Sequence, residues 1–211
     1  MTLLLVACFA VTASRARQAS GAPLDPPVRS FDQLYEEGQR RNAAMKTLTA
    51  RFTETTTSSL LVRPLIARGI VLVERPARVA LRYSQPDDRV IVIDDRTLTS
   101  SWPTTRTLNI ATVMNRVQKQ FIDGSAADLR REFEIDDRQT LATPDVYHVS
   151  MTPKRRQIRE ALTQLDLWVN RDSLLLSRMR MTFASGDTKT MTFEDVVTNA
   201  PLPPGAFERP R

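Results

Sequence analysis

Apolar and polar residues alternate along most of this chain, and a period of two residues is typical of β-strands with one buried face. The alternation starts in the segment 47–53 (TLTARFT) and runs on into a polar stretch that ends in an exposed hairpin. Further strands are predicted at residues 68–74, 77–84, 89–93, 97–102, 133–135, 146–151, 162–169, 174–183 and 189–197. The chain is therefore predicted to be mainly β.

Short turns separate these strands. Turn-forming residues occur at 75–76 (RP), 85–88 (QPDD), 94–95 (DD) and 185–187 (SGD). Connections this short join antiparallel neighbours. Because an antiparallel sheet of about ten strands twists and curls, we expect a single-domain, unclosed antiparallel β-barrel, which is a strongly curved sheet.

Three segments have helical periodicity instead. Ser30 and Gln33 form a capping box for a first helix. One face of this helix carries Phe31, Leu34, Tyr35, Gly38, Asn42 and Met45. A second helix is predicted at 110–121, after Asn109, and a third begins at Ser125. We expect the inserted helices to form a helical lid over the concave face of the sheet, and the first helix to lie over another element.

Two of the predicted strands are apolar on both faces, at 70–73 (IVLV) and 90–93 (VIVI). One apolar face is enough to build a core, so such strands must be covered on both sides. We expect one cover to be packing within the protein and the other to be a ligand.

Size and composition indicate one domain with a sizeable core, because the chain has 211 residues and 41% of them are hydrophobic. The formal net charge of +6 first suggests a nucleic acid or an anionic membrane as a partner. However, most of the basic residues are arginines spread along the chain among acidic neighbours. This distribution is that of a solvated surface, so we expect no nucleic-acid binding.

The first residues have the pattern of an export signal. Residues 3–13 (LLLVACFAVTA) form an apolar run that is too short to span a bilayer and has the length of a signal-peptide core. No basic residue precedes this run, which a start placed too far downstream would explain. We expect residues 1–22 to be a signal peptide, 23–29 a Pro-rich spacer and 30–211 the folded domain.

Cys8 is the only cysteine, and residues 5–8 (LVAC) resemble a lipobox, in which the cysteine becomes a lipid-modified N-terminus. The alternative, which we favour, is a chance cysteine in a peptide that is cleaved off. Either way the folded domain has no disulfide and depends on its core, which suits a bacterial periplasm.

Enzymatic chemistry has little support in the sequence. The single histidine, His148, lies in a predicted strand and has no second histidine or cysteine with which to hold a metal. No G-x-S-x-G motif or glycine-rich phosphate loop is present. The paired carboxylates lie in predicted turns. We therefore expect no catalytic residue, no metal and no cofactor, and a hydrolase is the weakest of the functional alternatives.

Several segments match one family pattern in order and spacing. They are 45–54 (MKTLTARFTE), 69–76 (GIVLVERP), 85–86 (QP), 152–154 (TPK) and Phe207. In series, over nearly the whole folded domain, they resemble the LolA family of periplasmic lipoprotein carriers. The resemblance implies an incomplete antiparallel barrel closed by helices.

The resemblance also implies partners and a mechanism. A LolA-like chaperone accepts a triacylated lipoprotein from an inner-membrane ABC transporter and hands it to a LolB-type outer-membrane acceptor, in the periplasm of a Gram-negative bacterium. We expect such a carrier to be a monomer. Arg75 matches a family arginine that hydrogen-bonds to the lid and holds the empty form shut. Alternatively, Arg75 only ends a strand, with its guanidinium in solvent.

A carrier is physically reasonable because each buried methylene is worth about 0.8 kcal/mol, so three acyl chains carry on the order of 20–30 kcal/mol of apolar surface. We expect a lipid cavity lined by the sheet and the lid; the sequence leaves open which strand face points inward. The predicted lining residues are Val71, Val73, Val79, Leu81, Tyr83, Val90, Val92, Ile110, Val113, Met114, Val117, Phe121, Met179 and Met181.

One departure from the family pattern leaves the cargo open. The family usually has an aromatic-rich strand after an Asp-Gly turn, whereas this chain has 94–95 (DD) followed by 99–102 (TSSW). Two alternatives to a lipoprotein carrier remain. The cargo is another envelope lipid or a glycolipid, or the protein is a LolB-like receptor or sensor anchored through Cys8.

Overall fold

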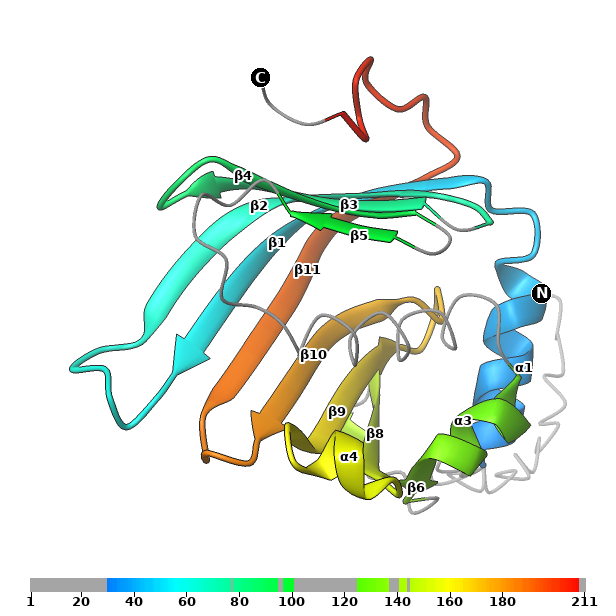
Figure 1. The fold of residues 1–211 in the computed structure, drawn as a ribbon. Coiled ribbons are helices and arrows are strands. Elements are labelled where there is room, and N and C mark those ends of the chain that lie inside the picture. Colours follow the sequence, from blue (N-terminus) through cyan, green and yellow to red (C-terminus); the bar gives the residue numbers. More distant parts are fainter. Residues whose placement is uncertain are drawn as a thin grey trace, which may run out of the picture.

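The structure is a computed structural model that describes residues 30–76, 78–94, 97–100, 125–136, 141–143 and 145–208. The predicted signal peptide and spacer, Cys8 and the predicted helix at 110–121 lie outside the described residues. The described chain forms a strongly curved sheet with helices at one end and along one edge (Figure 1).

The sheet contains eleven strands of the described chain, in the order β5-β4-β3-β2-β1-β11-β10-β9-β8-β6, with β7 paired to β8. Their bounds are β1 (Thr47–Thr57), β2 (Leu65–Glu74), β3 (Arg78–Gln85), β4 (Arg89–Asp94), β5 (Thr97–Ser100), β6 (Phe133–Ile135), β7 (Leu141–Thr143), β8 (Val146–Pro153), β9 (Leu162–Asn170), β10 (Leu176–Phe183) and β11 (Thr188–Thr198). All pairs are antiparallel. Within the described residues β5 and β6 do not pair, so the barrel is unclosed and the predicted fold class is confirmed.

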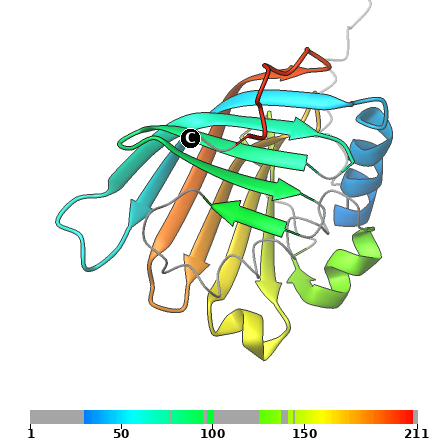
Figure 2. The same cartoon turned by 45° about the horizontal axis from the view of Figure 1, so that its top comes forward.

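The helices are α1 (Phe31–Arg41), α3 (Ala126–Glu132) and α4 (Arg156–Arg159). The predicted capping box is present at the start of α1, where Ser30 and Gln33 each accept a hydrogen bond from the other's backbone N–H. Ser125 caps α3 in the same way. Arg130 Nε donates to Asp32 Oδ1 at 2.8 Å and joins the two helices at one end of the curved sheet (Figures 1 and 2).

Two short elements were not predicted, and one strand starts later than expected. β7 and α4 are only three and four residues long, too short for periodicity to reveal. β10 begins at Leu176 because Leu174 has φ 55°, which lies outside the extended region. The predicted hairpin turn between β10 and β11 is confirmed, with Gly186 at φ 86°.

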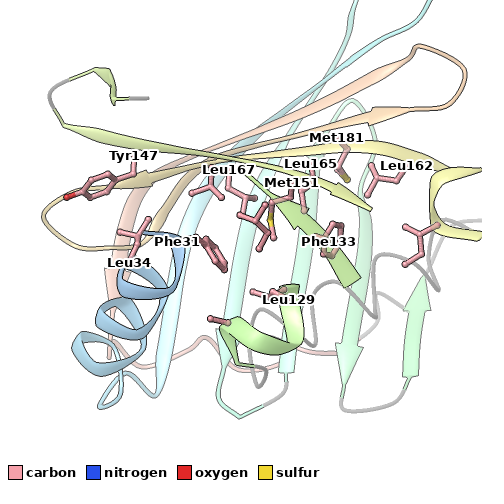
Figure 3. Packing of buried hydrophobic residues seen from close by; sticks show 14 of the residues in the cluster. Phe31, Leu34, Leu129, Phe133, Tyr147, Met151, Leu162, Leu165, Leu167 and Met181 are labelled. Atoms are coloured by element: carbon pink, nitrogen blue, oxygen red, sulfur yellow. The ribbon is translucent and has the colours of Figure 1, made fainter. Parts of the chain in front are cut away.

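One hydrophobic cluster holds α1 and α3 against the concave side of β8–β10. Figure 3 shows Phe31 and Leu34 of α1, together with Leu129 of α3, directed toward Met151 and Leu167 on the sheet. All five are buried, four of them almost completely. This packing fixes α1 across the concave face.

A separate cluster covers the convex face of β2–β4. Its buried members on the sheet are Leu72, Ala80, Val90 and Val92, and the segment after β11 covers them with Leu202, Ala206 and Phe207. Arg82 Nη1 holds this C-terminal segment by donating to the backbone oxygens of Gly205 at 3.1 Å and Ala206 at 3.2 Å. The chain itself therefore provides the second cover that strands with two apolar faces need.

Candidate functional site

A cavity of about 400 Å³ lies between α1 and the concave face of the sheet. It is lined from α1 and its C-cap by Phe31, Leu34, Tyr35, Gly38, Gln39 and Asn42, and from the strands by Leu48, Ala50, Val71, Val73, Val79, Leu81, Val149, Leu167, Val169, Leu176, Met179, Met191, Phe193 and Val196. Met45, Arg75, Leu174 and Leu175 complete the lining. The cavity is thus bounded by strands from both halves of the sheet.

Small side chains and strand alternation together create this space. Successive side chains of a strand point to opposite faces, so Val71 and Val73 of β2 point to the same side as Ala50 of β1, the cross-strand neighbour of Val71. Ala50 and Gly38 place little volume between the helix and the sheet. A Cβ at Gly38 would lie 3.8 Å from Leu174 Cβ, so the absence of a side chain there leaves α1 close to the β9–β10 turn.

The cavity is mostly apolar, and three of its polar side chains, Tyr35, Gln39 and Asn42, are satisfied locally. Gln39 Nε2 donates to Tyr35 Oη at 3.1 Å. Asn42 Nδ2 donates to the backbone oxygens of Gly38 at 3.0 Å and Ser173 at 3.3 Å. These bonds lie within α1 or between α1 and the turn beside it. The remaining lining is almost entirely aliphatic, aromatic or thioether, which suits a hydrocarbon ligand.

Five predicted lining residues lie where the sequence placed them. Val71, Val73, Val79, Leu81 and Met179 all line the cavity. They come from β2, β3 and β10, so the structure brings together residues that are more than a hundred positions apart in the chain. It also decides which face of β2 and β3 points inward.

Four other predicted residues, Tyr83 among them, do not line the cavity, and this corrects the lining set. Val90 and Val92 are buried on the convex face, under the C-terminal segment. In the β3–β4 register Val79 pairs with Ile93 and Leu81 with Ile91, so the isoleucines of β4 share the concave face. Met181 is absent from the cavity lining and packs in the cluster under α1 and α3. Ile110, Val113, Met114, Val117 and Phe121 lie outside the described residues.

Tyr83 is on the concave face but beyond the cavity, where an ionic cluster begins. Its ring packs edge-on against Phe52 at 4.9 Å, and its hydroxyl donates to Glu54 Oε2 at 2.8 Å. Glu54 is buried and also contacts Lys189 Nζ at 3.1 Å and Arg89 Nη2 at 3.6 Å. Burial, with the Glu54 carboxylate beside it, raises the pKa of Tyr83 well above its usual range. These polar groups therefore mark the end of the apolar cavity lining on this side.

Arg75 lies directly after β2 and lines the cavity, half-buried. Its backbone N–H donates to the Lys46 carbonyl at 2.8 Å, which fixes the backbone at this point. No hydrogen bond or ion pair joins its guanidinium to another described residue. Arg75 is therefore the cation placed among the apolar lining side chains.

The α1 side of the site was only partly anticipated. All six residues that helical spacing placed on one face, from Phe31 to Met45, do line the cavity. The pattern indicated that this face covers something but not that it encloses a hollow. Leu174 and Leu175 were missed altogether, because they belong to a turn and no periodicity marks them.

His148 has a structural environment, as expected for a lone strand histidine. Its Nε2 lies 3.0 Å from Asp166 Oδ1, and its ring stacks on Trp168 at 4.7 Å. Among the described residues, no three His, Cys, Asp or Glu side chains are grouped so that they could hold a metal ion. Nor does that part of the chain contain a helix long and apolar enough to cross a membrane.

The fold and the cavity define a curved-sheet binding protein with an apolar internal site. The model of the family described as outer membrane lipoprotein carrier protein LolA matches residues 43–210, so the chain belongs to this family. No curated protein sequence matches the chain significantly. The family assignment therefore rests on the family model, and the resemblance seen in the sequence is confirmed.

Solved structures share the fold at low sequence identity. A LolA superfamily protein from Nitrosomonas europaea is 14% identical over 86% of this chain and 98% of its own, with a TM-score of 0.47. The complex of MucA and MucB from Pseudomonas aeruginosa gives 14% identity over 83% of this chain and 61% of the matched chain, with a TM-score of 0.50. Lipoprotein LppX from Mycobacterium tuberculosis gives 11% identity, 82% and 99% coverage and a TM-score of 0.45. These likenesses concern the fold alone.

Proposed function

We propose that this protein carries acyl chains, shielding them from water in the cavity between α1 and the concave sheet. The observation that supports this most is the composition of that cavity, which is apolar on the helix side and on the sheet side. Gln39 bonds to Tyr35 and Asn42 bonds to the backbone, so these polar side chains do not demand a polar ligand. Membership of a lipoprotein carrier family points to the same cargo class.

The size of the cavity suggests how loading proceeds. About 400 Å³ is within the range of about 300–1,000 Å³ that holds one drug-sized ligand. Three acyl chains need more room than this, so full loading requires α1 or another cover to move away from the sheet. Because each buried methylene contributes about 0.8 kcal/mol, a long chain can offset the contacts that are lost when the cavity opens.

The proposed cellular role follows the family pattern. Residues 1–22 direct export to the periplasm of a Gram-negative bacterium, and the folded domain acts there as a monomer without a cofactor. An inner-membrane ABC transporter supplies an acylated lipoprotein, and a LolB-type protein at the outer membrane receives it. The family match over residues 43–210 supports this assignment.

Arg75 is proposed as the latch of the empty form. Among the residues that the structure describes, it is the one arginine in the cavity lining, so its guanidinium can compete with an apolar ligand for the same space. A hydrogen bond to a charged group contributes about 1.5–3 kcal/mol, enough to favour the empty closed form without making it permanent. The family pattern implies that the guanidinium hydrogen-bonds to the lid in the empty form. Entry of an acyl chain would break that bond, and its return would favour release.

Replacing Arg75 with leucine should therefore slow the release of lipid about tenfold, because the competing closed form would lose the proposed hydrogen bond from Arg75 to the lid. The measurement is the rate at which a fluorescent acylated peptide moves from the loaded protein to acceptor vesicles. Arg75→Lys, which keeps the charge but loses the planar fork, should give an intermediate rate. Release from Arg75→Leu at the wild-type rate would exclude a latch role.

The cargo itself can be identified by extracting the lipids that copurify with the exported protein and analysing them by mass spectrometry. We expect acylated lipoprotein or a phospholipid bearing long acyl chains. A mass spectrum of the protein's mature N-terminus shows whether Cys8 is retained and diacylated. A diacylated Cys8 would favour a membrane-anchored receptor over a diffusing carrier. A protein that carries no acylated molecule from its native envelope would contradict the proposal.

A further inference from the structure

The hairpin that joins β1 to β2 exposes an unusual concentration of apolar side chains. We define the hairpin tip as residues 58–66. Leu60 is 90% exposed and Val62 is fully exposed, while Leu61, Leu65 and Ile66 are also exposed. Exposing one such side chain is common, but five of them within seven residues indicate a surface that is covered in use.

The tip is a defined turn rather than a loose end. The backbone N–H of Leu61 donates to the Ser58 carbonyl at 3.1 Å, and the N–H of Leu60 donates to Ser58 Oγ at 3.2 Å. Figures 1 and 2 show the hairpin extending past the rest of the sheet, at the end of β1 and β2 opposite α1. The apolar group is therefore held on a narrow projection, well away from the cavity.

The charges of the hairpin indicate what covers it. From Thr55 to Val73 the sequence contains two arginines, Arg63 and Arg68, and no aspartate or glutamate. Both arginines are exposed. Arg63 lies within the apolar group, between Val62 and Leu65, so its long side chain would extend to the headgroups when the tip enters a lipid surface. Apolar side chains interspersed with cations are a combination that binds anionic lipid interfaces.

From these observations we propose that the hairpin tip inserts into an anionic lipid surface and docks the protein there. A narrow, convex tip offers only a few hundred Å² of apolar surface. A stable protein interface needs about 800 Å² from each partner, whereas a lipid interface accepts side chains at a depth of about 5–10 Å without a matching shape. The turn hydrogen bonds of Leu60 and Leu61 also lower the cost of removing their backbone groups from water. The inference is independent of the cavity and goes beyond the proposed carrier function.

The test is cosedimentation of the full exported protein with vesicles of two compositions, phosphatidylglycerol mixed with phosphatidylcholine and phosphatidylcholine alone. We expect binding to the anionic vesicles and much weaker binding to the neutral ones. In the double variant Leu60→Ser/Val62→Ser, the affinity for anionic vesicles should fall about tenfold for each substitution, because each removes apolar surface from the inserted tip. Arg63→Ser should lower the affinity about fivefold, and only for the anionic vesicles.

A matched control is the double variant Ile70→Ser/Val197→Ser, which removes two aliphatic side chains that are 39% and 49% exposed outside the tip. It should bind vesicles as the wild type does. The variant Val73→Trp, which fills the cavity, should also keep vesicle binding, so failure of the carrier function and failure of the docking inference can be told apart. The inference would be overturned if the wild-type protein bound neither vesicle type, or if the tip variants bound vesicles with the wild-type affinity. Concentration-dependent dimers that the tip variants abolish, with no vesicle binding, would instead assign the tip to a second copy and overturn it too.

Discussion

Substituting Val73 with tryptophan should reduce acyl-chain binding at least tenfold while leaving the protein folded. Val73 is half-buried on β2, on the face that lines the cavity. An indole there takes up much of the space of about 400 Å³ that a hydrocarbon chain would occupy. Because the position is not closely packed, the larger side chain can be accommodated without the strain that overpacking causes in a full core.

The measurement for this variant is equilibrium binding of a fluorescent fatty acid, with circular dichroism to confirm the fold. Ile70→Trp is the matched control, because Ile70 lies on the same strand, is exposed and does not line the cavity. It should bind the fatty acid as the wild type does. If Val73→Trp binds equally well, the acyl chain occupies another place and the cavity is not the site.

Replacing Gly69 with alanine should destabilise the fold by about 3 kcal/mol. A Cβ at this position would lie 2.1 Å from the Arg82 carbonyl oxygen and 2.8 Å from Tyr83 Cα, both on β3. Since these are backbone atoms, no side-chain rotation relieves the clash, and β2 and β3 must separate locally. The register of the two strands already shifts between Arg68 and Gly69, so the backbone approach is built into the pairing.

Urea denaturation measures this effect, and a lowering of the midpoint by about 1.5 M is expected. Gly38→Ala provides the contrast, because a Cβ there would meet nothing closer than 3.7 Å and the helix would gain about 0.5–1 kcal/mol. Its midpoint should therefore stay the same or rise. Wild-type stability in Gly69→Ala would mean that β2 and β3 do not approach as closely as described.

Local signals in the sequence were enough to predict the elements and the class of fold. The capping box at Ser30 and Gln33 is specific to a helix start, and the helix does begin at Phe31. Alternation likewise placed Val71 and Val73 on one face of a strand, which they share in the structure. Such signals depend on neighbours in the chain, so they can be read without knowing the fold.

The faces of β4 could not be assigned in this way. Its residues are apolar on both sides, so alternation shows that Val90 and Val92 share a face but not which one. The answer depends on the β3–β4 register, in which Val92 pairs with Ala80 on the convex face. A shift of one residue would reverse the assignment.

A cavity was expected, but its extent and its α1 wall were beyond sequence reasoning, because an internal space depends on how far α1 stands from the sheet. That separation results from the packing of side chains distant in sequence, such as Leu34 and Leu174. Likewise, Tyr83 follows Val79 and Leu81 on the same strand face, yet the cavity ends before it. Contact with Phe52 and the bond to buried Glu54 fill the space there.

The most direct test of the acyl-chain site is photo-cross-linking with a fatty acid that carries a diazirine in its chain, used below its micelle concentration, followed by mass-spectrometric mapping. Cross-links are predicted on the concave face, at Val73, Leu81 or Met179, and Val73→Trp should greatly reduce them. Cross-links confined to the convex face, at Val90, Val92 or Phe207, would contradict the account.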